Sequence, residues 1–178
     1  MVKSIMSELK IGDVISEPPA IILQQVQLEN QSFFNILNNS YYDSISKRAA
    51  FKQLSCNGII LGYYVASLNR FSLQEDIIEN FDEYKYYAVH LDLIYILPQY
   101  RNRSFGKATM QRFLVHARNV SAHTGCRFVT LDALKGLEEW YTSIGFVNTK
   151  IEGNSGATTK MFIDMRNKAM YDSFAEFP

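Results

Sequence analysis

The sequence has few of the residues that hold a chain together without a hydrophobic core. Its two cysteines, Cys56 and Cys126, are too few for a disulfide framework and lack the spacing of a zinc site. We interpret both as small buried side chains in a reducing cytosol. At 178 residues, about two-thirds of the unfolded chain's surface can be buried, so stability requires neither a disulfide nor a metal ion.

Long apolar runs and low-complexity segments are also missing. The longest apolar run, residues 58–66, is about half as long as a membrane span, and residues 1–13 lack the apolar core of a signal peptide. No segment repeats, and none has the composition of a linker. We therefore expect a single domain over residues 1–178, located in the cytoplasm and not in a membrane.

An excess of charge of one sign is absent from the chain as a whole but present locally. Lys and Arg total 18, and Asp and Glu also total 18. Residues 93–131 nevertheless contain bases and no acid. The bases of this segment are Arg101, Arg103, Lys107, Arg112, Arg118 and Arg127. Such a block within a neutral protein indicates a solvated face or a local anion site.

The first half of the sequence predicts helices that cover antiparallel strands. Apolar residues recur at roughly helical spacing over residues 32–50, which predicts one or two helices. Residues 51–68 predict a hairpin, because Asn57-Gly58 suits a tight turn. The acidic stretch 73–83 predicts a loop or short helix, and the β-branched and aromatic run 85–98 predicts a central strand.

The second half of the sequence alternates helices and strands. Its predicted elements are a helix over 105–124 that ends before Gly125, a strand over 126–133, a helix over 135–145, two strands over 146–165 around a turn at 153–156, and a helical tail over 166–178. Strands and helices that follow one another after an antiparallel start are typical of an α/β (α+β) fold.

The turn from Pro98 to Lys107 joins the predicted central strand to the following helix. The first N–H groups of a helix have no partner within it, and the helix dipole makes this end positive. Arg101, Arg103 and Lys107 add full charges at the same place. The turn is therefore a candidate anion site, and phosphate is the anion that suits it best.

Residues 93–108, LIYILPQYRNRSFGKA, resemble motif A of the GCN5-related N-acetyltransferase (GNAT) family. In that motif a central strand leads into the pattern Gln/Arg-x-x-Gly-x-Gly/Ala and a helix. Arg101 and Gly106 match the pattern, and Ser104 replaces its first glycine. A serine there could crowd the approach of a pyrophosphate to the backbone, although its hydroxyl can also donate a hydrogen bond.

A second segment, EEWYTSIGF, resembles the end of motif B of the same family, usually Phe-Tyr-x-x-x-Gly-Phe. Tyr141, Gly145 and Phe146 match this pattern, and Trp140 replaces its phenylalanine. Leu134 stands where family members often have an asparagine that contacts coenzyme A. The order and separation of the two segments make the resemblance more specific than either segment alone.

The resemblance covers about residues 50–165, which we expect to be the GNAT core. Residues 1–50 would then be the variable region on the acceptor side, in which residues 1–30 have no interpretable pattern, and residues 166–178 would be a tail. The resemblance implies a mixed, mostly antiparallel sheet of six or seven strands flanked by helices.

The resemblance also implies that the protein binds acetyl-coenzyme A (acetyl-CoA) and no metal ion. The pantetheine amides would pair with the backbone of the central strand, and the pyrophosphate would bind backbone N–H groups of the turn, with Arg101, Arg103 or Lys107 neutralising its charge. The implied cofactor-binding residues are Ile94, Tyr95, Ile96, Leu97, Arg101, Asn102, Arg103, Ser104, Phe105, Gly106 and Lys107.

Three residues are candidates for catalysis. Tyr141 matches the tyrosine that protonates the coenzyme A sulfur in this family. His90 and Asp92 fall on one face of the predicted strand, and either is a candidate base; His90 has the ordinary pKa nearer neutrality. Selection of a deprotonated amine from solution is an alternative to a base. The backbone N–H near Ile96 is the candidate donor to the oxyanion if the strand bulges there, as it does in family members.

The amine acceptor is open. The main interpretation is a primary amine of a small molecule, peptide or protein, and the acidic stretch 75–83 could attract a cationic one. The element order is also similar to toxin-type acetyltransferases that modify aminoacyl-tRNA. However, a Phe-Asp-Cys-Gly-like segment of those proteins and the excess positive charge of a tRNA binder are missing. A module that binds acyl-CoA without turnover is a third interpretation, and a homodimer is left open.

Overall fold

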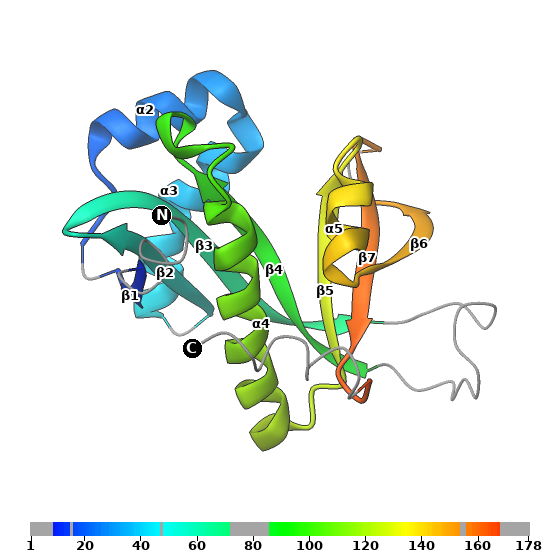
Figure 1. The fold of residues 1–178 in the computed structure, drawn as a ribbon. Helices are drawn as coiled ribbons and strands as arrows, with labels where there is room; N and C mark the ends of the chain where they lie inside the picture. Colours follow the sequence, from blue (N-terminus) through cyan, green and yellow to red (C-terminus); the bar gives the residue numbers. More distant parts are fainter. Residues whose placement is uncertain (1–8, 15, 47, 72–85, 154–155, 168–178) are drawn as a thin grey trace. The chain divides into compact units, whose positions relative to one another are not determined.

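The computed structural model describes residues 9–14, 16–46, 48–71, 86–153 and 156–167 (Figure 1). The acidic stretch 73–83 and nearly all of the predicted helical tail therefore lie outside the described residues. Among these described residues, seven strands form a sheet in the order β1-β2-β3-β4-β5-β7-β6. The strands are β1 (Leu9–Asp13), β2 (Ala49–Cys56), β3 (Ile59–Phe71), β4 (Tyr86–Ile96), β5 (Phe128–Leu134), β6 (Val147–Glu152) and β7 (Thr158–Asp164).

Helices accompany the sheet, which confirms the predicted α/β class. The α-helices are α2 (Ala20–Glu29), α3 (Gln31–Ile45), α4 (Phe105–Thr124) and α5 (Glu138–Ile144). The chain divides into two compact units: unit 1 comprises residues 1–67 and 91–110, and unit 2 comprises 68–90 and 111–178. Among the described residues, no helix is both long and apolar enough to cross a membrane.

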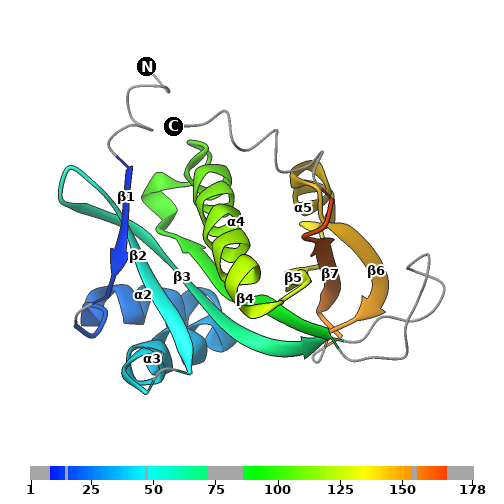
Figure 2. The same cartoon turned by 90° about the horizontal axis from the view of Figure 1, so that it is seen from below.

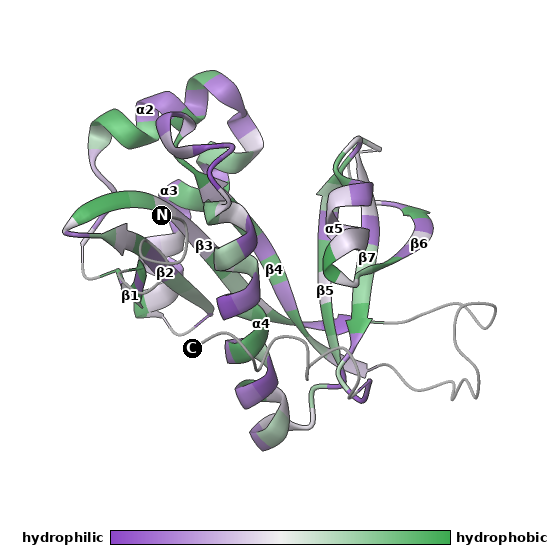
Figure 3. Ribbon diagram, in the orientation of Figure 1, coloured by the Kyte–Doolittle hydropathy of each residue, from purple (hydrophilic) through white to green (hydrophobic). Residues whose placement is uncertain are grey.

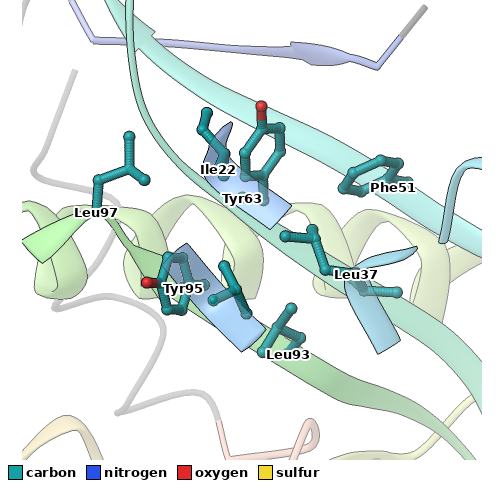
Figure 4. Packing of buried hydrophobic residues seen from close by; sticks show 9 residues of the cluster. Ile22, Leu37, Phe51, Tyr63, Leu93, Tyr95 and Leu97 are labelled. Carbon is teal, nitrogen blue, oxygen red and sulfur yellow. The ribbon is translucent and has the colours of Figure 1, made fainter. Parts of the chain in front are cut away.

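In unit 1, α2 and α3 pack on strands β2, β3 and β4 (Figure 2). Figure 4 shows the side chains that make this contact. The buried cluster consists of Ile22, Val26, Leu37, Phe51, Tyr63, Val65, Leu93, Tyr95 and Leu97. The predicted helix within 32–50 is thus confirmed as α3, and its cap is Asn30, whose side chain accepts the Phe33 N–H at 3.0 Å.

Helix α2 was not apparent in the sequence. Its apolar residues lie on several sides, so they form no stripe at helical spacing. Ile22 and Val26 are buried, whereas Ile21 and Leu28 are exposed. Strand β1 was also unpredicted; it pairs antiparallel with the edge of β2, with Leu9 opposite Cys56.

The predicted hairpin is confirmed as β2 and β3. Asn57 and Gly58 connect the strands with φ angles of 51° and 77°. Two successive positive φ angles are the geometry of the tight turn for which Asn-Gly is favoured. The predicted end of α4 is also confirmed, because Gly125 follows it with a φ of 71°.

In unit 2, β7 lies between β5 and β6 and runs antiparallel to both. Helix α5 contacts β5 and β6. A small aromatic cluster forms where Phe128 meets Phe162 and Tyr86, with ring centroids 5.7 and 5.2 Å apart. Figure 3 shows that β5, β7 and α4 each contain both polar and apolar bands.

Candidate functional site

The turn that follows β4 has backbone N–H groups that find no acceptor in the described part of the chain. The 3₁₀ helix η2 (Pro98–Tyr100) uses the N–H of Tyr100, which donates to Leu97 at 2.8 Å, and that of Arg101, which donates to Pro98 at 3.2 Å. The next bonded amide is that of Ala108, which donates to Ser104 at 3.0 Å. Within the described ranges, the N–H groups of residues 102–107 have no protein acceptor.

Two residues of this turn have left-handed backbone conformations. Asn102 has a φ of 59° and Ser104 a φ of 65°. Alternation of right- and left-handed residues points successive N–H groups into a concave nest that suits an anion. A glycine would take such a φ without cost, which gives a physical reason for the glycine that motif A has at the position of Ser104.

The charged side chains of the turn differ in their partners. Arg103 and Lys107 are exposed, and neither has an ion-pair partner in the part of the chain that the structure describes. Arg101 is engaged within unit 1: its Nη2 lies 2.6 Å from Glu29 Oε2, and its Nε donates to the Ile96 carbonyl at 3.0 Å. The charge of Arg101 is therefore partly neutralised by the protein.

The backbone at the end of β4 is in close contact with β3. The Leu97 N–H donates to the Leu61 carbonyl at 2.9 Å. At Gly62, a Cβ atom would lie 2.1 Å from the Tyr95 carbonyl oxygen, so only glycine permits this approach. Of the polar groups predicted to pair with pantetheine, the Leu97 N–H and the Ile96 carbonyl thus have protein partners.

Unit 1 also contains an open groove of about 660 Å³, whose lining is polar and apolar in similar parts. Helix α3 forms one wall, and Arg48 together with strands β2, β3 and β4 contributes the rest. The lining residues are Asn35, Ile36, Asn39, Ser40, Tyr42, Asp43, Arg48, Ala49, Val65, Ser67 and Asp92. Two carboxylates and one guanidinium give the lining a net negative charge, which favours a cationic ligand.

Asp92 and His90, the two candidate bases, have different surroundings. Asp92 lines the groove, and its Oδ1 accepts the Ser67 hydroxyl at 3.1 Å. His90 belongs to unit 2, and its Nδ1 lies 2.9 Å from the hydroxyl oxygen of Thr130, which is buried. The groove therefore contains Asp92 and not His90.

Tyr141 lies in α5 of unit 2, where it is 7% exposed. Its ring makes edge contacts with Trp140 and Phe146, with centroids 4.7 and 5.8 Å apart. Burial raises the pKa of Tyr141 to about 12, so the phenol keeps its proton at neutral pH. Gly145 ends this helix with a φ of 108°, which explains the glycine of the second motif.

The structure thus groups the predicted residues by unit. Asp92, the end of β4 and the turn belong to unit 1, whereas His90 and Tyr141 belong to unit 2.

Sequence reasoning missed the wall that α3 contributes to the groove. The signal was the four-residue spacing of Asn35, Asn39 and Asp43, which puts polar side chains on one helical face. No cluster of metal-ligating residues occurs among the described residues.

Comparisons with known proteins agree with this architecture. A structure of a bacterial toxin superposes with a TM-score of 0.74 at 17% identity, covering 94% of this chain and 96% of the toxin. A structure of AtaTR bound with acetyl-CoA has a TM-score of 0.71 at 16% identity, with coverages of 94% and 99%. AtaT complexed with acetyl-methionyl-tRNAfMet gives a TM-score of 0.70 at 15% identity, with coverages of 92% and 99%.

A search of curated proteins finds no match to the sequence. The family model described as acetyltransferase (GNAT) domain, in contrast, matches residues 29–167, which is most of the chain. The match extends beyond the two motifs into α3, the wall of the groove. The protein belongs to the GNAT family of acetyl-CoA-dependent N-acetyltransferases.

Proposed function

We propose that the protein transfers the acetyl group of acetyl-CoA to a primary amine that binds in the groove of unit 1, at Asp92. The observation that carries the proposal is the run of N–H groups at residues 102–107, at the N-terminus of α4, that have no acceptor among the described residues. These donors, the left-handed residues Asn102 and Ser104, and the exposed Arg103 and Lys107 suit a pyrophosphate. The residues present therefore fit the cofactor.

Acetyl-CoA supplies an acetyl group activated as a thioester. The end of β4 would hold the pantetheine arm through the backbone groups of Ile94, since the Leu97 N–H and the Tyr95 carbonyl face β3 and the Ile96 carbonyl accepts from Arg101. Tyr141 would donate its phenolic proton to the departing sulfur. Its raised pKa supports this role, because the donor must be protonated at the pH of the reaction.

An acceptor ammonium must lose a proton before it can attack, since its ordinary pKa is near 10. Asp92 is the base that we favour, because its carboxylate lines the groove and is oriented by the Ser67 hydroxyl. Asp43 lines the opposite wall, but it is paired with Arg48 at 2.8 Å, so the charge that would attract the cation is that of Asp92. We further propose the cytoplasm as the location, and the free thiols of Cys56 and Cys126 support it.

Two measurements test this function. Acetyl-CoA at saturating concentration should raise the melting temperature, because a ligand that binds only the folded state stabilises it. No shift would contradict the whole proposal. Labelled acetyl-CoA should then label amines in a panel of small molecules and peptides, with cationic amines preferred. Binding of acetyl-CoA without transfer of the label to any amine would instead support a module that binds acyl-CoA without turnover.

A second candidate acceptor is the amino group of an aminoacyl-tRNA. The observation in its favour is the likeness of fold over 92% of this chain to AtaT complexed with acetyl-methionyl-tRNAfMet. The equal totals of 18 basic and 18 acidic residues do not provide the excess charge that favours a large polyanion. Aminoacyl-tRNA in the same panel decides between the two acceptors. If the aminoacyl-tRNA is the acceptor, the acetyl label should enter the tRNA fraction and none of the small amines or peptides.

A further inference from the structure

Arg101 contacts three groups of unit 1 at once. Its Nε donates to the carbonyl of Ile96, the last residue of β4, at 3.0 Å. Its Nη2 donates to Glu29 at 2.6 Å, and its Cζ lies 5.3 Å from the centroid of the Tyr95 ring. Helix η2 lies between Ile96 and Arg101 in the sequence. The Arg101 side chain therefore connects the start of the turn to the end of β4, the strand that precedes the turn.

Glu29 connects the same turn to the helices of unit 1. It is the last residue of α2, and the next residue, Asn30, caps α3. Helix α3 in turn forms a wall of the groove. The ion pair between Arg101 and Glu29 therefore joins the start of the turn to the junction of α2 and α3, across 72 residues of sequence.

The pair is unfavourably arranged for a phosphate ligand. A phosphate that took the guanidinium would have to displace a carboxylate at 2.6 Å, and that carboxylate would then repel the phosphate. Arg103 and Lys107 have no carboxylate partner among the described residues, so a phosphate could bind them without displacing one. Arg101 is thus better placed to hold the turn than to bind the anion.

We propose that Arg101 and Glu29 form a latch that keeps the turn in the shape that binds the pyrophosphate. Arg101 is then a positioning residue, and the exposed Arg103 and Lys107 supply the charge. The proposal rests on the cofactor site proposed above. It predicts that removal of an acid, Glu29, weakens the binding of an anion.

Glu29→Gln separates this proposal from direct phosphate binding by the sign of its effect. If the latch positions the turn, the Kd for acetyl-CoA measured by titration calorimetry should rise about threefold, the size of effect expected when an exposed ion pair is lost. If Arg101 is a phosphate ligand restrained by Glu29, the same substitution should lower the Kd. A lowered or unchanged Kd overturns the latch.

Arg101→Lys provides a second, independent test. It keeps the positive charge but loses the guanidinium geometry that reaches Ile96 and Glu29 together. The latch predicts a rise in Kd at least as large as that of Glu29→Gln, and a double variant within about twofold of Arg101→Lys alone. An unchanged Kd in Arg101→Lys means that charge suffices, and it overturns the proposal.

Asp13→Asn is the matched control. It also removes an acid of unit 1 that pairs with a base at 2.6 Å, in this case Lys52. Its Kd for acetyl-CoA should stay within twofold of the wild type. For the latch variants we expect a higher KM for acetyl-CoA with kcat within twofold. Failure of the wild type to bind acetyl-CoA would reject the proposed function itself, which is a different result from a wrong sign in Glu29→Gln.

Discussion

Ser104 illustrates how one side chain departs from its family pattern without abolishing the local geometry. The family motif has glycine at this position, and Ser104 adopts the left-handed φ of 65° that glycine would take freely. The serine therefore keeps the shape of the turn while carrying a conformational cost. Asn102 has a φ of 59° and a smaller conformational cost, because asparagine tolerates the left-handed region better than most residues do.

Ser104→Gly should stabilise the protein. Relief of the left-handed conformation is worth about 1–2 kcal/mol, and the greater freedom of glycine in the unfolded state offsets about 0.5–1 kcal/mol of it. We expect a melting temperature about 1–4 °C higher by calorimetry. Asn102→Gly is the control and should give a smaller gain. A lower melting temperature in Ser104→Gly would show that the serine side chain makes a stabilising contact.

Tyr141→Phe should slow turnover by about 100-fold, the usual contribution of a positioned acid. The Kd for acetyl-CoA should stay within twofold, because the ring and its contacts with Trp140 and Phe146 remain. Since the pKa of Tyr141 is about 12, its ionisation should not reduce the rate below pH 10. Tyr87→Phe, the same change at an exposed tyrosine, is the control. An unchanged kcat would remove Tyr141 from the mechanism.

At the scale of elements, β3 and β4 form a contact that local patterns did not predict. The central strand was predicted from its β-branched and aromatic residues, and β4 confirms it. The role of Gly62 was not predicted, because it depends on the Tyr95 carbonyl of a different strand. Likewise, the order β5-β7-β6 follows from pairing between distant segments, whereas the existence of each strand followed from its own residues.

Gly62→Ala should strongly destabilise unit 1. The added Cβ would lie 2.1 Å from a backbone oxygen, which cannot rotate away as a side chain can. We expect a loss of about 3 kcal/mol in the free energy of unfolding, measured with denaturant. Gly12→Ala, in β1, is the control, because its Cβ would meet no atom within 4 Å. Equal stability of the two variants would contradict the close approach of β3 and β4.

At the scale of the whole molecule, burial of tyrosines should make the fold sensitive to alkali. Burial raises the pKa of each of Tyr63, Tyr64, Tyr95 and Tyr141 from 10.0 to about 12. Between these values the unfolded phenols lose protons that the folded ones keep. The contribution of the four protonated phenols to the stability of the fold is therefore complete below pH 10, and it is lost as the pH rises towards 12.

We expect the free energy of unfolding to fall by as much as about 5 kcal/mol per pH unit in this window, from four phenols at about 1.4 kcal/mol each. Denaturant titrations at several pH values from 8 to 11.5 measure the slope. Tyr63→Phe should reduce the slope by about a quarter without loss of stability at pH 8, because the buried Tyr63 hydroxyl has no hydrogen-bond partner within the residues that the structure describes. A slope unchanged by this substitution would contradict the burial of the phenol.

The sequence by itself determined the features that depend on neighbouring residues. These are the Asn57-Gly58 turn, the bounds of α4, the central strand, and the two motifs that indicated the family. Turn geometry, helix ends and strand propensity are local, so a short window of residues contains them.

Only the tertiary structure decided which groups lie beside one another. The engagement of Arg101 by Glu29 joins residues 72 apart, and the groove brings Asn35 of α3 together with Ser67 of β3 and Asp92 of β4. The sequence marked Arg101 as a charge near an anion site, but its partners decide whether that charge binds a ligand or holds the backbone. Contacts between distant segments follow from how the elements pack, and no local pattern of residues encodes them.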